Sequence, residues 1–137
     1  MEIGKSIYNI LSGNTPVNTL VGTRIYPNVA PQASAVFPFI IYDVTGVEPT
    51  NYKSGTSSLD TNSVMISAYC KTYSEASDLA NKIRIAMDRI TQGTYGGEQI
   101  QSSEFQGYND IFDATSSNAG IYRKALDFQI RQINPTN

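Results

Sequence analysis

Acidic side chains are the residues of this chain whose types and spacing come closest to supporting catalysis. Asp110 and Asp113 lie three positions apart, and Glu98 and Glu104 precede them in the sequence. Two carboxylates in one site can act as general acid and general base. Asp110 and Asp113, however, stand at the end of an expected strand beside a turn, and no other catalytic motif accompanies either pair. We therefore expect these carboxylates to be solvated and not catalytic.

Other catalytic and metal-binding chemistry needs residue types that the chain lacks. It has no histidine, which removes the usual general base and the commonest metal ligand. The single cysteine, Cys70, continues the apolar face of an expected strand, so we predict a small buried hydrophobic residue. A cation site with Asp43 or Asp60 has no better support than the paired carboxylates. We expect no catalytic residues, no metal and no cofactor.

The composition points to contact with protein more than to contact with nucleic acid or a membrane. Charged residues are 16% of the chain, below the usual ~25%. The net charge is -2, and the ten Lys and Arg residues are scattered, so no nucleic-acid footprint is expected. No apolar run approaches ~20 residues, and no signal peptide is expected. A surface poor in charge and rich in Tyr suits persistent contact with other protein, or is merely polar.

The periodicity of the apolar residues predicts two amphipathic helices and a short helical turn. Ile3, Ile7, Ile10 and Leu11 recur at helical spacing in the first helix. A helical turn over residues 17–20 follows, with Thr15 as its expected N-cap and Pro at the next position. The clearest helix spans residues 74–90, with Ser74 as N-cap and one apolar stripe along its length.

Five strands are expected, and they cover residues 24–26, 39–47, 64–70, 98–112 and 121–133. The fourth contains a bulge near Gly107, and Tyr95-Gly96-Gly97 before it is expected to be a turn. The polar segment 48–61 has no period and is expected to be a long loop. This order predicts an α+β fold: an antiparallel or mixed sheet of four to five strands, with an N-terminal helix and one long central helix on one face. We expect one domain over residues 1–137, with a loose end at 134–137.

A few residues outside the expected core are candidates for contact with a partner. Tyr52 and Lys53 stand in the expected long loop, and an exposed Tyr offers a large contact area at low entropic cost. The alternative is that this loop is simply solvated. Arg24 is either a structural partner of the sheet or an interface anchor, and we favour the structural role.

An ordered set of short motifs resembles the tail-completion, or tail-terminator, family of long-tailed, siphovirus-like bacteriophages. The motifs follow an opening helix that ends near Leu11 and run through nearly the whole chain. They are Val21-Gly22-Thr23-Arg24-Ile25-Tyr26-Pro27, Ala30-Pro31-Gln32, Phe37-Pro38-Phe39-Ile40-Ile41-Tyr42, Gly55 with Leu59-Asp60, Glu75-Ala76-Ser77-Asp78-Leu79-Ala80, and Tyr122-Arg123-Lys124. The indistinct strand at 98–112 and the long polar turn before residue 121 depart from the family's pattern.

The resemblance implies a structural protein of the virion tail or neck, assembled in the cytoplasm of the bacterial host. Members form a ring, commonly a hexamer, that caps the head-proximal end of the tail tube and stops its polymerisation. The implied partners are copies of the chain itself, the major tail-tube protein and the head-side connector or stopper protein, with viral DNA passing through the lumen and no membrane involved. The interface candidates are Arg24, Tyr26, Pro31, Gln32, Tyr52, Lys53, Ser54 and Gly55.

Two other classes of function stay open from the residues alone. One is another head-to-tail adaptor or a tail-tube-like ring subunit, which also works by assembly. The other is a small non-viral ligand-binding α+β domain, working as a monomer or dimer. A carboxylate-based enzyme is disfavoured because histidine is absent.

Overall fold

The computed structural model describes residues 3–28, 37–52, 55–90, 92–113 and 121–133, and its centre is one six-stranded sheet. The strands are β1 (Ile25–Pro27), β2 (Phe39–Tyr52), β3 (Gly55–Cys70), β4 (Gly93–Tyr95), β5 (Glu98–Asp113) and β6 (Ile121–Ile133). Their order across the sheet is β1-β2-β3-β6-β5-β4. β1 runs parallel to β2 and every other neighbouring pair is antiparallel, so the sheet is mixed, as the sequence predicts.

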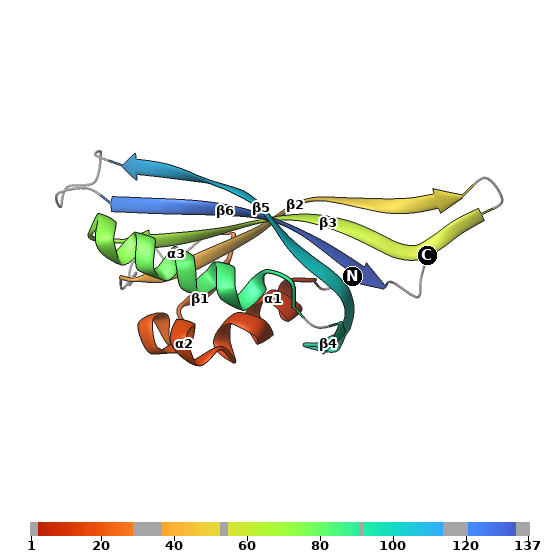
Figure 1. The fold of residues 1–137 in the computed structure, drawn as a ribbon, viewed down its shortest axis with the longest axis horizontal. Coiled ribbons are helices and arrows are strands. Elements are labelled where there is room, and N and C mark those ends of the chain that lie inside the picture. Colours follow the sequence, from red (N-terminus) through yellow and green to blue (C-terminus); the bar gives the residue numbers. More distant parts are fainter. Residues whose placement is uncertain (1–2, 29–36, 53–54, 91, 114–120, 134–137) are drawn as a thin grey trace.

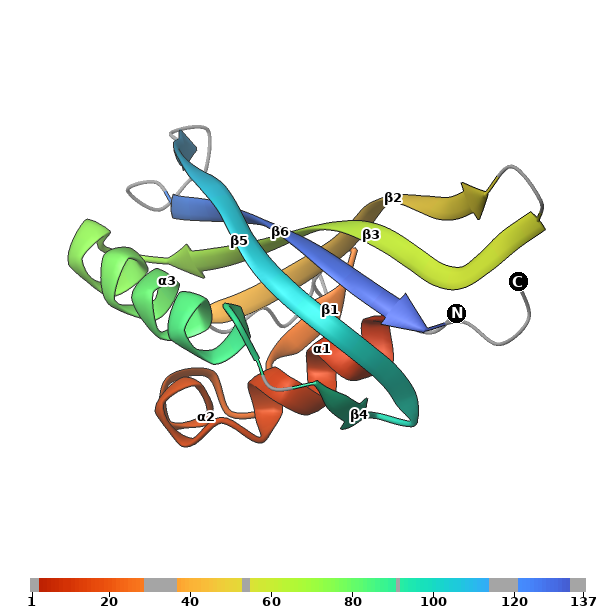
Figure 2. The ribbon, with the colours of Figure 1, turned by 45° about the vertical axis from the view of Figure 1, so that its right-hand side comes forward.

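Three helices lie on the same face of this sheet: α1 (Ile3–Ser12), α2 (Thr15–Val21) and α3 (Tyr73–Met87). Figure 1 and Figure 2 show the three below the sheet, with the other face free of described helices. The predicted α+β class is therefore confirmed. The expected count of four to five strands is too low by one, because β4 has only three residues and is too short to show a period.

The core forms where α3 crosses the two central strands. Alternate residues of β3 and β6 point toward the helices, and Ile66 and Phe128 are almost completely buried there. Leu79 and Ile83 of α3 and Ile7 of α1 are likewise buried in this cluster. On β6 the buried face carries Leu126, Phe128 and Ile130.

The ends of the helices differ from the sequence expectation by one to three residues. The N-cap of α2 is Asn14, whose Oδ1 accepts a hydrogen bond from the backbone N–H of Val17 at 3.2 Å. Thr15, the expected cap, is already the first helical residue. The N-cap of α3 is Thr72, not Ser74, and its Oγ1 accepts from the N–H of Glu75 at 3.2 Å. Both errors exchange one polar residue for a near neighbour of similar capping ability.

α3 ends at Met87, three residues before the expected end at Ile90, because the chain turns there onto β5. Asp88 is the C-cap, and its Oδ1 accepts a hydrogen bond from the N–H of Phe105 at 3.0 Å. Arg89 has a positive φ of 54° and donates its backbone N–H to the carbonyl of Ser103 at 2.7 Å. The end of α3 is therefore fixed by hydrogen bonds to β5.

The prediction of a long loop over residues 48–61 is wrong. β2 continues to Tyr52 and β3 begins at Gly55, and these two residues pair with each other. β6 ends at Ile133, opposite Leu59, so residues 50–58 pair only within this hairpin among the described strands. We call residues 50–59 the arm; it extends beyond the helices in Figure 1. A strand without a core beneath it needs no alternation of apolar and polar residues, which is why the pattern resembled a loop.

The predicted bulge in β5 and the predicted turn before it are both confirmed. The register of β5 against β6 shifts between Phe105 and Gly107. Gly96 and Gly97 connect β4 to β5 with φ values of 58° and 85°, a backbone conformation that favours glycine. At Gly96 an added Cβ would lie 2.7 Å from the backbone oxygen of Lys5 in α1. The β4–β5 turn is therefore packed against the first helix.

Replacing each turn glycine by alanine should separate backbone strain from helix contact. Gly97→Ala meets no atom within 4 Å and should cost about 1–2 kcal/mol of unfolding free energy, from its positive φ alone. Gly96→Ala adds a clash with α1 and should cost more. Urea unfolding followed by circular dichroism measures both. Equal losses would show that α1 moves away from the turn without cost.

Candidate functional site

The candidate residues around β1 make internal contacts. The Arg24 guanidinium donates from Nε to the carbonyl of Pro38 at 3.0 Å and from an Nη to the carbonyl of Leu20 at 3.2 Å. It therefore ties the end of α2 to the start of β2, which is the structural role that the sequence favoured. The half-buried ring of Tyr26 lies 6.1 Å from the ring of Phe39. Pro31 and Gln32 lie outside the described residues.

The remaining sequence candidates belong to the tip of the arm. Tyr52 and Gly55 form the last strand pair of the β2–β3 hairpin. Lys53 and Ser54, between them, lie outside the described residues. The structure thus brings Tyr52 and Gly55 together, far along the strands from Arg24 and Tyr26, so the candidates form two separate groups. Their role in an interface stays a prediction.

Three of the four carboxylates that are candidates for catalysis are engaged by different partners. The Glu104 carboxylate pairs with Arg131 at 2.9 Å, and Glu98 accepts a hydrogen bond from the Gln132 side chain at 2.8 Å. Asp110 pairs with the Lys124 amine at 2.6 Å. The side chain of Asp113 lies outside the described residues. Within the part of the chain that the structure describes, no three His, Cys, Asp or Glu residues are grouped as metal ligands would be.

Cys70 is the buried hydrophobic residue that the sequence predicted. Burial, and then the nearby Glu75 carboxylate, raise the pKa of its thiol to about 12. The thiol is therefore protonated at neutral pH, and a protonated thiol is a poor nucleophile and a poor metal ligand.

Lys124 is held in an aromatic and acidic site beside β5. Its amine lies 4.9 Å from the ring centre of Tyr73 and 4.8 Å from that of Tyr108. Burial lowers the pKa of this amine, but the hydrogen bonds and charges of Asp110 and Tyr73 outweigh it, so the net pKa is raised. The amine remains charged and neutralises Asp110 at this edge of the sheet.

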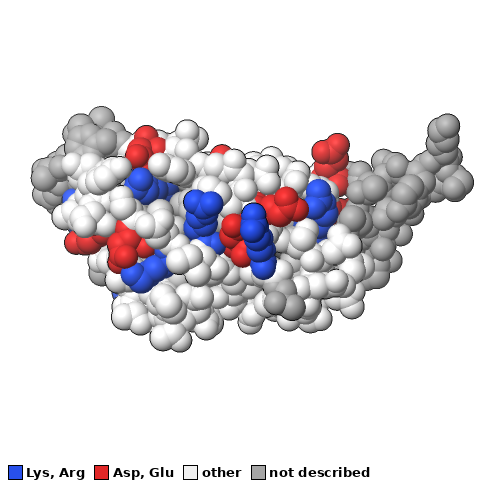
Figure 3. All heavy atoms as spheres, in the orientation of Figure 1, with Lys and Arg blue, Asp and Glu red and all other residues white. Residues whose placement is uncertain are grey.

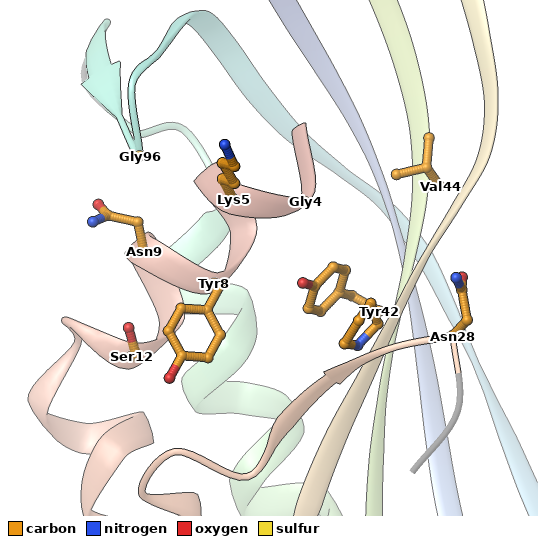
Figure 4. A pocket seen from close by; sticks show the side chains of 10 residues that line it. Gly4, Lys5, Tyr8, Asn9, Ser12, Asn28, Tyr42, Val44 and Gly96 are labelled. Atoms are coloured by element: carbon orange, nitrogen blue, oxygen red, sulfur yellow. The ribbon is translucent and has the colours of Figure 1, made fainter. Parts of the chain in front are cut away.

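A groove of about 720 Å³ separates α1 from β1 and β2. Figure 4 shows the rings of Tyr8 and Tyr42 in the space between the helix and the strands, with Val44 farther along β2. No Asp or Glu lines it among the described residues. It offers aromatic and amide surface suited to contact, not to bond making. This groove is not predictable from the sequence, because it depends on how α1 packs against β1 and β2.

Exposed apolar side chains gather along the two outer long strands, which sequence reasoning missed. Seven large apolar side chains are exposed among the described residues: Tyr8, Val44, Val47, Tyr73, Ile85, Tyr108 and Ile111. Four of them lie on β2 and β5. Tyr73 lies close to β5, because the Lys124 amine contacts both its ring and the ring of Tyr108. On the face shown in Figure 3, positive and negative side chains are interspersed, with no field of a single sign. β2 and β5 therefore carry most of the large apolar side chains that are exposed on the described surface.

Comparison with known proteins settles the family. A match to the family described as tail completion protein gp17 covers residues 5–133. The chain belongs to this tail completion family. The match spans nearly all of the fold described above, so the motif-based resemblance is confirmed. The chain is accordingly a structural protein of the virion tail of the bacteriophage type.

A solved structure agrees with the fold of this tail completion protein. It is a chain of the "Virion of native gene transfer agent (GTA) particle", with a TM-score of 0.73 and 18% sequence identity. The alignment covers 93% of this chain and 91% of that chain, so the two share their whole architecture. No match is found among curated proteins. None of the described helices is long and apolar enough to cross a membrane.

The contacts of Arg24 predict a structural cost when this residue is removed. Arg24→Ala leaves the carbonyls of Leu20 and Pro38 without their donor and should lower the unfolding free energy by about 1–3 kcal/mol. Lys82→Ala, which removes an exposed ion pair with Asp78, is the matched control and should cost less than about 0.5 kcal/mol. Chemical denaturation measures both. Similar losses for the two variants would show that the Arg24 bridge is not stabilising.

Proposed function

We propose that copies of this tail completion protein form a closed ring that caps the head-proximal end of the tail tube. The ring stops polymerisation of the tube and joins the tail to the head-side connector. The observation that carries this proposal is the arm, a hairpin that extends past its own sheet and helices on a chain of the tail completion family. Strand pairing that continues past the end of β6 and past the helices is most readily explained as a contact element.

A ring requires contacts between unlike surfaces of neighbouring copies. Such heterologous contacts close into a ring when the rotation between neighbours is right. This subunit has two unlike sides, one at β2 and one at β5, which lie on either side of the central β3–β6 pair. Both sides carry exposed apolar side chains. A hexamer is the copy number that the family resemblance implies.

The arm runs along the strands and so points toward one end of the subunit. If the strands are inclined to the ring axis by less than a right angle, the arms of all copies project from the same end of the ring. The projecting arms can then contact the last ring of the tail tube. The opposite end, from which β5 and β6 turn, is left for the head-side connector.

The lumen of such a ring suits passage of viral DNA without sequence-specific binding. The described face in Figure 3 has interspersed charges, and the chain carries a net charge of -2. A basic surface would retain the phosphate backbone electrostatically. The similarity in fold to a chain from a whole virion particle further supports a place in an assembled tail.

Shortening the arm tests its role in capping. Replacing residues 50–59 with Asn-Gly joins the paired residues Pro49 and Asp60 through a two-residue hairpin turn. The variant should fold, because the core is untouched, but it should fail to cap tail tubes assembled from the cognate major tail-tube protein. Negative-stain electron microscopy of tube ends and tube lengths gives the readout.

Ile85→Lys, an equally surface-directed change on α3, is the control and should cap normally. Normal capping by the shortened variant would refute the role of the arm. Incorporation of the wild-type chain along the tube, with continued growth, would identify a tail-tube-like subunit and overturn the terminator assignment. Turnover of a small molecule by a monomer would overturn the structural role altogether.

A further inference from the structure

We propose that the outer edge of β2 in one subunit pairs, antiparallel, with the outer edge of β5 in the next, so that one continuous sheet runs around the ring. This inference rests on the proposed ring and names the surfaces that close it. It follows from the backbone hydrogen bonds, from the side chains at the two edges and from the strand directions.

No described residue pairs with the outer edge of β2 beyond Tyr42. β1 pairs only with Ile40–Tyr42, where the N–H of Ile40 donates to Arg24 and the carbonyl of Tyr42 accepts from Asn28. Outward-directed backbone groups recur at every second residue of an antiparallel strand. Val44 and Val47 also belong to this outward-directed set. Their partners on β3 are Val64 and Asn62, which are two positions apart and therefore share one orientation, and the register shift after Val44 accounts for the extra residue on β2.

Pro49 continues the same outward set, since its partner on β3 is Asp60. Proline has no N–H and is tolerated on an edge strand. It therefore ends the row of outward donors, and the free edge of β2 is the stretch 43–48.

β5 has a free edge of similar length. Its earlier part is covered, since β4 pairs with residues 98–100 and the end of α3 bonds to Ser103 and Phe105. After the bulge, Tyr108 and Asp110 direct their backbone groups outward, because their β6 partners, Leu126 and Lys124, continue the same alternation. Among the described residues, nothing pairs with the outer edge of β5 from Gly107 to its end at Asp113.

The side chains at the two edges match across the proposed junction. Val44 lies opposite Val64, and Tyr108 lies opposite Leu126, so both edge residues point to the face of the sheet that carries the helices. Val47, opposite Asn62, points to the same face. In a sheet that continues from one copy to the next, these side chains become cross-strand neighbours. Pairs of aromatic and β-branched residues are favourable in that position.

The strand directions require an antiparallel junction. β2, β3, β6 and β5 alternate in direction across the sheet, so β2 and β5 run in opposite senses. Across one copy Val44 stands level with Phe105, and Tyr108 stands level with Tyr42, so the two free stretches meet only in a ring whose strands are inclined to its axis. A moderate inclination keeps each strand direction nearly the same from one copy to the next. β5 of one copy therefore meets β2 of the next in opposite directions, and the alternation continues around the ring.

A second copy explains both edges at once, whereas a foreign peptide would cover only one. Free edges are usually blocked by lysine, proline or short strands. β5 contains no Lys, Arg or Pro over its sixteen residues, and it carries Tyr108 with 58% of its surface exposed. Closing the sheet on itself covers both of these free stretches without any other partner.

Opposite charges placed at the two edges test this pairing. Val47→Lys and Tyr108→Glu each put a charge at a position where the wild-type side chain is exposed in the monomer. The melting temperature should therefore change little, while the number of capped tube ends should fall about tenfold for each variant, as expected for a disrupted interface core. The double variant should recover most of the capping, because Lys of one copy then faces Glu of the next. Ile85→Lys, on a residue 79% exposed on α3, should have no effect.

Photo-crosslinking identifies the pairing directly. Benzoylphenylalanine at position 47, in protein bound to tail tubes, should give inter-subunit peptides from residues 101–113 by mass spectrometry. The edge pairing would be overturned if the crosslinks lay elsewhere and both single variants still capped the tubes normally. The terminator proposal would remain intact in that case. Failure of the wild-type chain to form any ring on the tubes would overturn both.

Discussion

The fold depends on the limited reach of its helices over a much longer sheet. α3 is a helix of 15 residues, whereas β3 and β5 each have 16, and a strand residue advances about twice as far as a helical one. The helices therefore cover only part of one face, from the C-terminal end of β3 to the region of Ile66 and Phe128. Beyond that cover the β2–β3 hairpin keeps its backbone pairing. The arm results from this mismatch, whereas the free edges of β2 and β5 result from the shortness of β1 and β4.

Much of the fold could be predicted because burial imposes a period on the sequence. The alternation in residues 64–70 and 121–133 and the stripe of α3 all reflect one shared core. Where burial ends, the period ends as well, and residues 48–61 were mistaken for a loop. β4 was missed for a related reason, since three residues are too few to establish an alternation. Helix caps were misplaced by one or two positions because Asn14 and Thr72 stand beside residues that cap equally well.

The candidate site was less predictable than the fold, and the reason is geometric. Arg24 was recognised from its position, but its bonds to Leu20 and Pro38 join residues that only the folded chain brings together. Val47 and Tyr108 were not singled out, because a sequence does not show which strands lie outermost. The order β1-β2-β3-β6-β5-β4 is set by long-range pairing, and exposure along β2 and β5 follows from that order.

The insertion of β6 between β3 and β5 has a consequence for the timing of virus assembly. β6 is the final strand in the chain, yet it completes the middle of the sheet. During synthesis on the ribosome, the first hairpin emerges long before the strand that unites it with β5. Until that last segment arrives, no single molecule displays both complementary borders. In the proposed ring, a chain that lacks β6 could not hold β2 and β5 in one sheet, so it could not contribute both edges.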